Sequence, residues 1–89
     1  PKDFESWGNL GVCLLAIGRP KQASEALRNS LLLRRDQQVM REKWAEAKVA
    51  AGEGADELDG AHSYARDNPD DRLVYLVIER IHILLHQPE

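Results

Sequence analysis

Cysteine, aromatic residues and long apolar runs are scarce in this chain of 89 residues, and each shortage excludes a class of protein. Cys13 has no second cysteine to pair with, so no disulfide can form within the chain. Its place in the apolar run from Val12 to Leu15 predicts a small buried hydrophobe. No stretch of about 18 apolar residues is present, which argues against insertion into a membrane. Because aromatics make up only 6%, the core is expected to consist mainly of Leu, Ala, Val and Ile.

Charge of one sign is not concentrated in any part of the chain. Twelve Lys and Arg residues are interspersed with fifteen Asp and Glu residues, for a formal net charge of -3. Proteins that bind nucleic acid through its phosphates usually carry a basic stripe or arm, so we expect no nucleic-acid partner. The content of 43% hydrophobic and 30% charged residues is typical of one small globular domain.

The start of the chain carries no recognisable targeting signal. It begins with Pro1 instead of Met, and its first residues have neither the basic start nor the apolar middle of a signal peptide. We expect the chain to be a part of a larger multi-repeat protein. The sequence does not determine the compartment, although the cytoplasm is favoured.

Apolar residues recur at helical spacing in five segments. The predicted helices span residues 3–17, 20–34, 37–51, 56–67 and 73–85. Gly18 supplies a stop for the first helix, Pro20 suits the first turn of the second, and an Asp after Pro69 is expected to cap the fifth. The β-branched residues of the fifth segment would also suit a buried strand. Its length, and the lack of another strand to pair with, favour a helix.

Landmark residues recur after 34 residues, which is the length of one helix-turn-helix unit of the tetratricopeptide class. The recurring pairs are Leu10 and Trp44, Gly18 and Gly52, and Arg35 and Pro69. In residues 4–36 the chain resembles the tetratricopeptide repeat family, whose signature has the form W-x-x-L-G-x-x-Y followed by a turn glycine and an early Ala in the second helix. The residues in those places are Trp7, Leu10, Gly11, Leu14 instead of Tyr, Gly18 and Ala23.

The resemblance continues more faintly through the rest of the chain. In residues 38–70 Glu57 stands where the family has a small residue, and residues 71–87 would be the first helix of a third unit or a capping helix. The resemblance implies one all-α domain over residues 1–89, built of antiparallel helix-turn-helix repeats stacked as a short right-handed solenoid of five helices. Small residues such as Gly11 would let helices approach, while Trp7 and Leu10 would fill the gap between them. Trp7 and Trp44 would then occupy equivalent places. An ordinary helical bundle is the alternative, although a bundle does not require turn glycines at a fixed interval.

In this family the first helix of each unit lines a concave groove that binds a peptide. The resemblance therefore implies a partner-binding groove formed by Val12, Leu15, Ala16, Glu42, Glu46, Val49, Arg80 and Ile83. Such a mixed lining suits a peptide with apolar anchors and one or two basic groups. The alternative for Glu42 and Glu46 is a solvated helix face with Arg41, Lys43 or Lys48 nearby.

The expected function is a non-catalytic protein-protein interaction scaffold. The alternatives are a regulatory or positioning arm of a larger enzyme such as a transferase, and a structural role that joins chains end to end.

One activity of the family is not expected here. Members that hold the C-terminal carboxylate of a chaperone project Lys, Asn and Arg side chains from successive first helices. The corresponding residues of this chain are Gly8, Val12, Lys43, Leu73 and Val77. Only one of them is basic and none is Asn, so we expect no binding to an acidic chaperone tail.

The fifth predicted helix is apolar around much of its circumference. Either the second helix of a third unit covers it in the larger protein, or its exposed side meets another chain, and an uncovered apolar stripe would favour self-association. The candidate residues for this contact are Val74, Tyr75, Ile78, Ile81 and Leu85.

His82 and His86 are four residues apart with Glu79 on the same side, but neither a zinc-protease motif nor a Cys pair accompanies them. We expect no catalytic residue, no metal and no cofactor.

Overall fold

The computed structural model of the chain describes residues 3–86 and contains five α-helices. They are α1 (Phe4–Ala16), α2 (Pro20–Leu33), α3 (Gln38–Ala50), α4 (Gly54–Asp67) and α5 (Arg72–Leu85). Residues 3–86 contain no strand, so the all-α prediction is confirmed, including the helix in the β-branched fifth segment. None of the five helices combines the length and the apolar character that crossing a bilayer requires. Residues 1, 2 and 87–89, which the predicted domain includes, lie outside the described residues.

Local interactions determine where the helices begin and end. The carboxylate of Asp3 accepts a hydrogen bond from a first-turn amide of α1 at 2.7 Å, and Asp71 does the same for α5 at 3.1 Å. Gly18 and Gly52 follow α1 and α3 with φ angles of +81° and +79°, a conformation that glycine adopts without strain. Pro20 is the first residue of α2. These local signals confirm the predicted turns and the predicted Asp cap.

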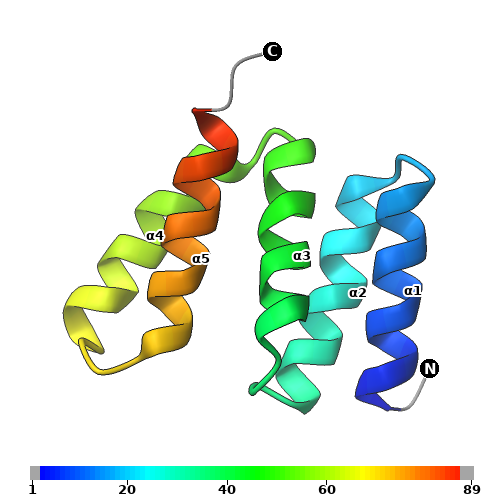
Figure 1. Ribbon diagram of the computed structural model, residues 1–89, viewed down its shortest axis with the longest axis horizontal. Coiled ribbons are helices and arrows are strands. Elements are labelled where there is room, and N and C mark those ends of the chain that lie inside the picture. Colours follow the sequence, from blue (N-terminus) through cyan, green and yellow to red (C-terminus); the bar gives the residue numbers. More distant parts are fainter. Residues whose placement is uncertain (1–2, 87–89) are drawn as a thin grey trace.

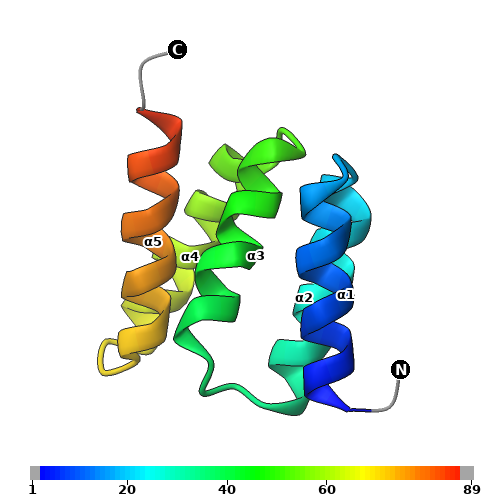
Figure 2. The ribbon, with the colours of Figure 1, turned by 45° about the vertical axis from the view of Figure 1, so that its right-hand side comes forward.

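The helices form two layers. α1, α3 and α5 run in one direction, and α2 and α4 run in the opposite direction (Figure 1). In the turned view α1, α3 and α5 lie in front, with α2 and α4 behind them (Figure 2). Helices joined by short turns alternate in direction in this way. The result is a helical repeat-like arrangement.

The two hairpins of this arrangement pack differently. α1 and α2 share the most extensive helix-helix interface in residues 3–86, and α2 packs next against α3. In the second hairpin α3 touches α4 only slightly, and α5 packs against both of them. α1 and α3, which would be neighbouring first helices of a solenoid, are barely in contact. The second hairpin therefore does not reproduce the first.

Three small clusters of buried side chains hold the helices together. The α2–α3 cluster consists of Ala23, Leu27 and Ala47, the α3–α5 cluster of Ala45, Val77 and Ile81, and the α4–α5 cluster of Ala61, Ala65 and Val74. Trp44 packs against both the α2–α3 and the α3–α5 cluster. α3 is therefore the helix that joins the two halves of the domain.

α1 and α2 approach each other at small residues. A Cβ atom built on Gly11 would lie 2.5 Å from Cγ of Leu27, so only glycine allows this approach. Ser30 is fully buried, and its hydroxyl donates a hydrogen bond to the backbone oxygen of Phe4 at 2.7 Å. The predicted role of Gly11 in helix approach is confirmed.

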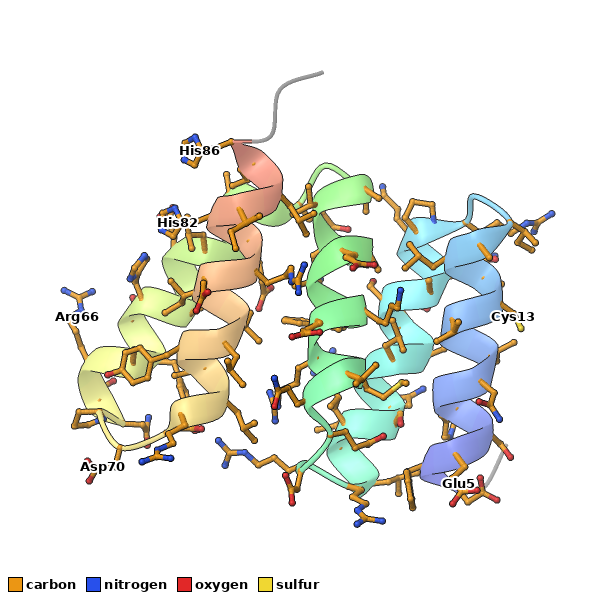
Figure 3. The ribbon with its side chains drawn as sticks, viewed as in Figure 1. Glu5, Cys13, Arg66, Asp70, His82 and His86 are labelled. Carbon is orange, nitrogen blue, oxygen red and sulfur yellow. The ribbon has the colours of Figure 1, made fainter. Side chains whose placement is uncertain are left out.

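Three predictions about α1 are wrong. Leu10 is 39% exposed and fills no gap between helices, whereas Trp44, its equivalent 34 residues later, packs against two clusters. Trp7 is half-buried but is not among the side chains packed against the three clusters, so the two tryptophans are not in equivalent surroundings. Cys13 is exposed on the outer side of α1 (Figure 3). The reason is that, within residues 3–86, α1 packs extensively only against α2, which leaves much of its surface open to solvent.

Candidate functional site

The predicted groove residues lie on α1, α3 and α5, but several of them contribute to the core. Val12 and Leu15 are half-buried against the α2–α3 cluster, and Val49 is half-buried against the α3–α5 cluster. Ala16 and Ile83 are exposed. Because three of the apolar side chains already contact the core, the apolar surface open to a partner is smaller than the sequence predicted.

The charged groove residues are paired within the domain. A guanidinium nitrogen of Arg80 on α5 lies 3.5 Å from Oε1 of Glu42 on α3, so the structure brings these two predicted residues together. Nζ of Lys43 lies 3.5 Å from Oε2 of Glu46 on the same helix. This pair agrees with the alternative interpretation of Glu46, in which it belongs to a solvated helix face with a lysine nearby. Partly exposed ion pairs contribute about 0–1 kcal/mol. A basic group of a ligand can therefore replace either cation at little cost.

The positions that correspond to the chaperone-tail clamp do not form a basic cluster. Gly8 and Val77 are buried, and Leu73 is half-buried. Lys43 pairs with Glu46. The lack of binding to an acidic chaperone tail remains a prediction, now supported by the burial of these positions.

Most of the residues predicted for self-association are covered by neighbouring helices. Val74 and Ile81 are only 9% and 0% exposed, and Ile78 is half-buried against the α4–α5 cluster. The prediction of an uncovered stripe through all five residues is therefore wrong, because α5 packs against both α3 and α4. Tyr75 and Leu85 remain 45% and 41% exposed. Self-association itself remains a prediction with a smaller surface to support it.

The three histidines lie near one another on α4 and α5. The rings of His82 and His86 stack with centroids 5.9 Å apart, and His62 meets His82 edge-on at 5.9 Å. His82 lies in the last turn of α5, and His86 directly follows this helix (Figure 3). Within residues 3–86 no three His, Cys, Asp or Glu side chains are grouped so that they could hold a metal ion. The expectation of no native metal remains a prediction.

A pocket of about 470 Å³ opens between α2 and α4, where the sequence predicted no site. Its apolar lining includes Leu31 of α2, Trp44 of α3 and Val77 of α5, and Arg41 and Glu57 add charged groups. The backbones of α2 and α4 do not approach each other closely in the described part of the chain. The pocket therefore occupies the space between the closed first hairpin and the open second one.

A network of three side chains closes one end of this pocket. Arg35, which follows α2, forms an ion pair with Asp71 at the start of α5. The hydroxyl of Tyr64 on α4 accepts a hydrogen bond from Arg35 at 3.2 Å and donates one to Asp71 at 2.8 Å. Asp71 also caps α5. The carboxylate of Asp71 is therefore fully engaged, and the network ties α4 and α5 to the linker between α2 and α3.

Arg41 and Trp44 each bring to the pocket lining a buried polar group without a hydrogen-bond partner among the described residues. The Nε–H of Arg41 is buried and has no hydrogen-bond partner in residues 3–86, and the same is true of the indole N–H of Trp44. Burial lowers the pKa of the Arg41 guanidinium below its ordinary value, the nearby Arg35 lowers this pKa further, and Tyr64 opposes the shift. Because arginine still stays protonated at neutral pH, the pocket contains a partly buried positive charge. No carboxylate of the described residues forms an ion pair with it.

Comparison of the chain with protein-family models, with curated proteins and with solved structures found no match. The candidate sites therefore depend on the geometry described above.

One sequence signal could have revealed the pocket. Arg41 follows Trp7 by 34 residues, so it stands where the repeat signature has a tryptophan. A charged residue at this position departs from the resemblance, and Arg41 lines the pocket in the structure.

Proposed function

We propose that the chain is a non-catalytic protein-binding module of the tetratricopeptide type, which holds a partner along the face shared by α1, α3 and α5. The observation that carries the proposal is the contact of 3.5 Å between Arg80 and Glu42. It joins charged side chains of two successive odd-numbered helices into one continuous surface. The two-layer arrangement in Figure 2 and the 34-residue recurrence also support it.

The chemistry of this face indicates the kind of partner. Glu42 and Glu46 are partly exposed carboxylates on one side of α3, and they would attract Lys or Arg side chains. Ala16 and Ile83 offer exposed apolar contacts on the flanking helices. The partner is therefore a peptide segment with one or two basic residues between apolar ones, and its basic groups exchange with Arg80 and Lys43.

Charge reversal tests this proposal. Peptides selected from a random displayed library on the immobilised chain would be measured by calorimetry against the wild type and the double variant Glu42→Lys, Glu46→Lys. We expect the double variant to bind at least about tenfold more weakly, because attraction at both positions becomes repulsion. The control is the double variant Glu25→Lys, Asp59→Lys, which makes the same charge change at exposed residues of α2 and α4.

Thermal unfolding followed by circular dichroism would show that each variant is folded at the binding temperature. Equal affinity of the selected peptides for both double variants would refute the assignment of this face. Loss of binding in the control alone would place the partner on the α2–α4 side.

A further inference from the structure

Arg41 is a half-buried cation of the pocket lining that forms no ion pair with the described residues, whereas Arg28, also unpaired there, is exposed. Four ion pairs connect Arg35, Lys43, Lys48 and Arg80 to carboxylates within residues 3–86, and Arg41 takes part in none of them. A guanidinium removed from water without a counter-charge is unfavourable. Arg41 is half-buried, so part of this cost applies to it, and an anion bound beside the guanidinium would reduce that cost.

The carboxylates that line the pocket do not supply the missing anion. Asp71 is occupied by Arg35, Tyr64 and the first turn of α5. Glu57 is half-buried on α4 and forms no ion pair in the described residues. Neither carboxylate of the lining therefore pairs with Arg41, and its charge is open to an external anion.

The remaining lining of the pocket is apolar and determines what must accompany the anion. Leu31, Trp44, Val74 and Val77 line the pocket together with Arg41. Its volume of about 470 Å³ lies within the range of about 300–1,000 Å³ that is typical of pockets for small organic ligands. An inorganic ion would leave this apolar surface in contact with water. The lining therefore suits a ligand that joins an apolar group to one charged end.

We infer that this pocket binds a small organic acid whose carboxylate pairs with Arg41 and whose aromatic or branched apolar group lies against Trp44. The planar guanidinium offers two parallel N–H donors, which match the two oxygens of a carboxylate. Three arginines and two carboxylates line the pocket, which leaves one net positive charge. This balance favours a monocarboxylate over a doubly charged phosphate ester. The site is separate from the proposed protein-binding face and does not depend on it.

Matched probes separate the contribution of the charge from that of the apolar group. The probes are 4-phenylbutyrate, its neutral amide 4-phenylbutyramide, and 4-phenylbutylamine, each titrated into the chain by calorimetry. We expect the carboxylate to bind at least about tenfold more tightly than the amide, because a charge-assisted hydrogen bond is stronger than a neutral one. The amine should bind least tightly of the three.

The two tryptophans provide an internal control for the location of binding. In amide-proton correlation spectra, the indole N–H signal of Trp44 should shift during titration with the carboxylate. The indole signal of Trp7, which is not among the pocket residues, should stay in place. A shift of the Trp7 signal without one of Trp44 would overturn the assignment.

Variants test the two parts of the site independently. Arg41→Met keeps the apolar stem and removes the charge, so it should abolish the preference for the carboxylate over the amide. Arg19→Met, at an exposed arginine outside the pocket, should keep the preference unchanged. Glu57→Gln removes an opposing charge and should tighten carboxylate binding by about two- to fivefold.

Gly60 allows the pocket to be blocked without removing any charged group. It lines the pocket, and a Cβ atom built on it meets no atom within 4 Å. Gly60→Leu should therefore take up space in the pocket and reduce binding of both the carboxylate and the amide at least about tenfold. Ala55→Leu, at an exposed residue of α4 outside the pocket lining, should bind both probes as well as the wild type. Circular dichroism would confirm that each variant remains helical.

Three results would overturn the inference. They are equal affinity for the carboxylate and the amide, an unchanged preference in Arg41→Met, and normal binding in folded Gly60→Leu. A capped tripeptide that ends in phenylalanine with a free carboxylate provides the last comparison. Tighter binding of this peptide than of 4-phenylbutyrate would identify a peptide terminus as the ligand and refute the small-acid assignment.

Discussion

Replacing Gly11 with alanine should destabilise the domain, although alanine is the better helix former. The added Cβ atom would lie 2.5 Å from Cγ, 2.7 Å from Cδ2 and 3.2 Å from the backbone nitrogen of Leu27. Leu27 is 0% exposed, so its side chain has little free space to turn into, and its backbone nitrogen belongs to α2. The two helices must therefore move apart or Leu27 must leave its preferred rotamer.

The size of the effect follows from two opposing contributions. Overpacking of a core position costs about 1–3 kcal/mol, and the close approach to a backbone atom favours the upper half of this range. The higher helix propensity of alanine returns about 1 kcal/mol. The expected net loss is about 1–2 kcal/mol, which corresponds to a decrease in Tm of about 5–15 °C for a domain of this size.

Gly60→Ala provides the matched control, because Gly60 also lies inside a helix but a Cβ atom there meets nothing within 4 Å. It should raise the stability by about 0.5–1 kcal/mol. Urea denaturation followed by circular dichroism would measure both variants. In a Leu27→Ala background, Gly11→Ala should destabilise the domain less, because the two side-chain atoms that the new Cβ atom meets are removed while the backbone nitrogen at 3.2 Å remains. Equal stabilisation by the two glycine substitutions in the wild-type background would refute the close contact between α1 and α2.

Three further outcomes follow from the structure. Leu27→Ala should lower the free energy of unfolding by about 2–5 kcal/mol, whereas Leu32→Ala, at a residue that is 72% exposed, should change it by less than about 0.5 kcal/mol; similar losses in urea denaturation would contradict the assigned core. Hydrogen bonds from Ser6 lower the pKa of Asp3 below its ordinary value, so its contribution to stability is present above the unfolded-state pKa and is lost as the pH falls through the folded-state value. A carboxyl titration by NMR should find this low pKa, and Asp3→Asn should lessen the acid sensitivity; an ordinary pKa would show that the cap is not formed in solution. The exposed thiol of Cys13 should react with an aromatic disulfide reagent without denaturant, and protection of this thiol until unfolding would show that α1 is covered.

The sequence predicted the features that depend on neighbouring residues. Asp71, Gly18 and Pro20 act within one turn of the chain, so their roles can be recognised without knowing the tertiary structure. The exposure of Leu10 could not be recognised in this way, because it depends on whether a third helix covers α1. The pocket could not be predicted from the sequence for the same reason. Its lining residues come from four helices, so the pocket exists only in the assembled domain.

The difference between the two hairpins has a physical basis in the residues at equivalent places. In the first hairpin Ala23 and Ser30 are small and fully buried, which allows α2 to lie close to α1. The residues 34 positions later are Glu57 and Tyr64, and a carboxylate and a phenol do not fit into such a close interface without losing contact with water. Both side chains instead line the pocket, and α3 is free to pack against α5 through Ala45. The same two substitutions thus explain why the second hairpin opens and why a polar-rimmed pocket forms there.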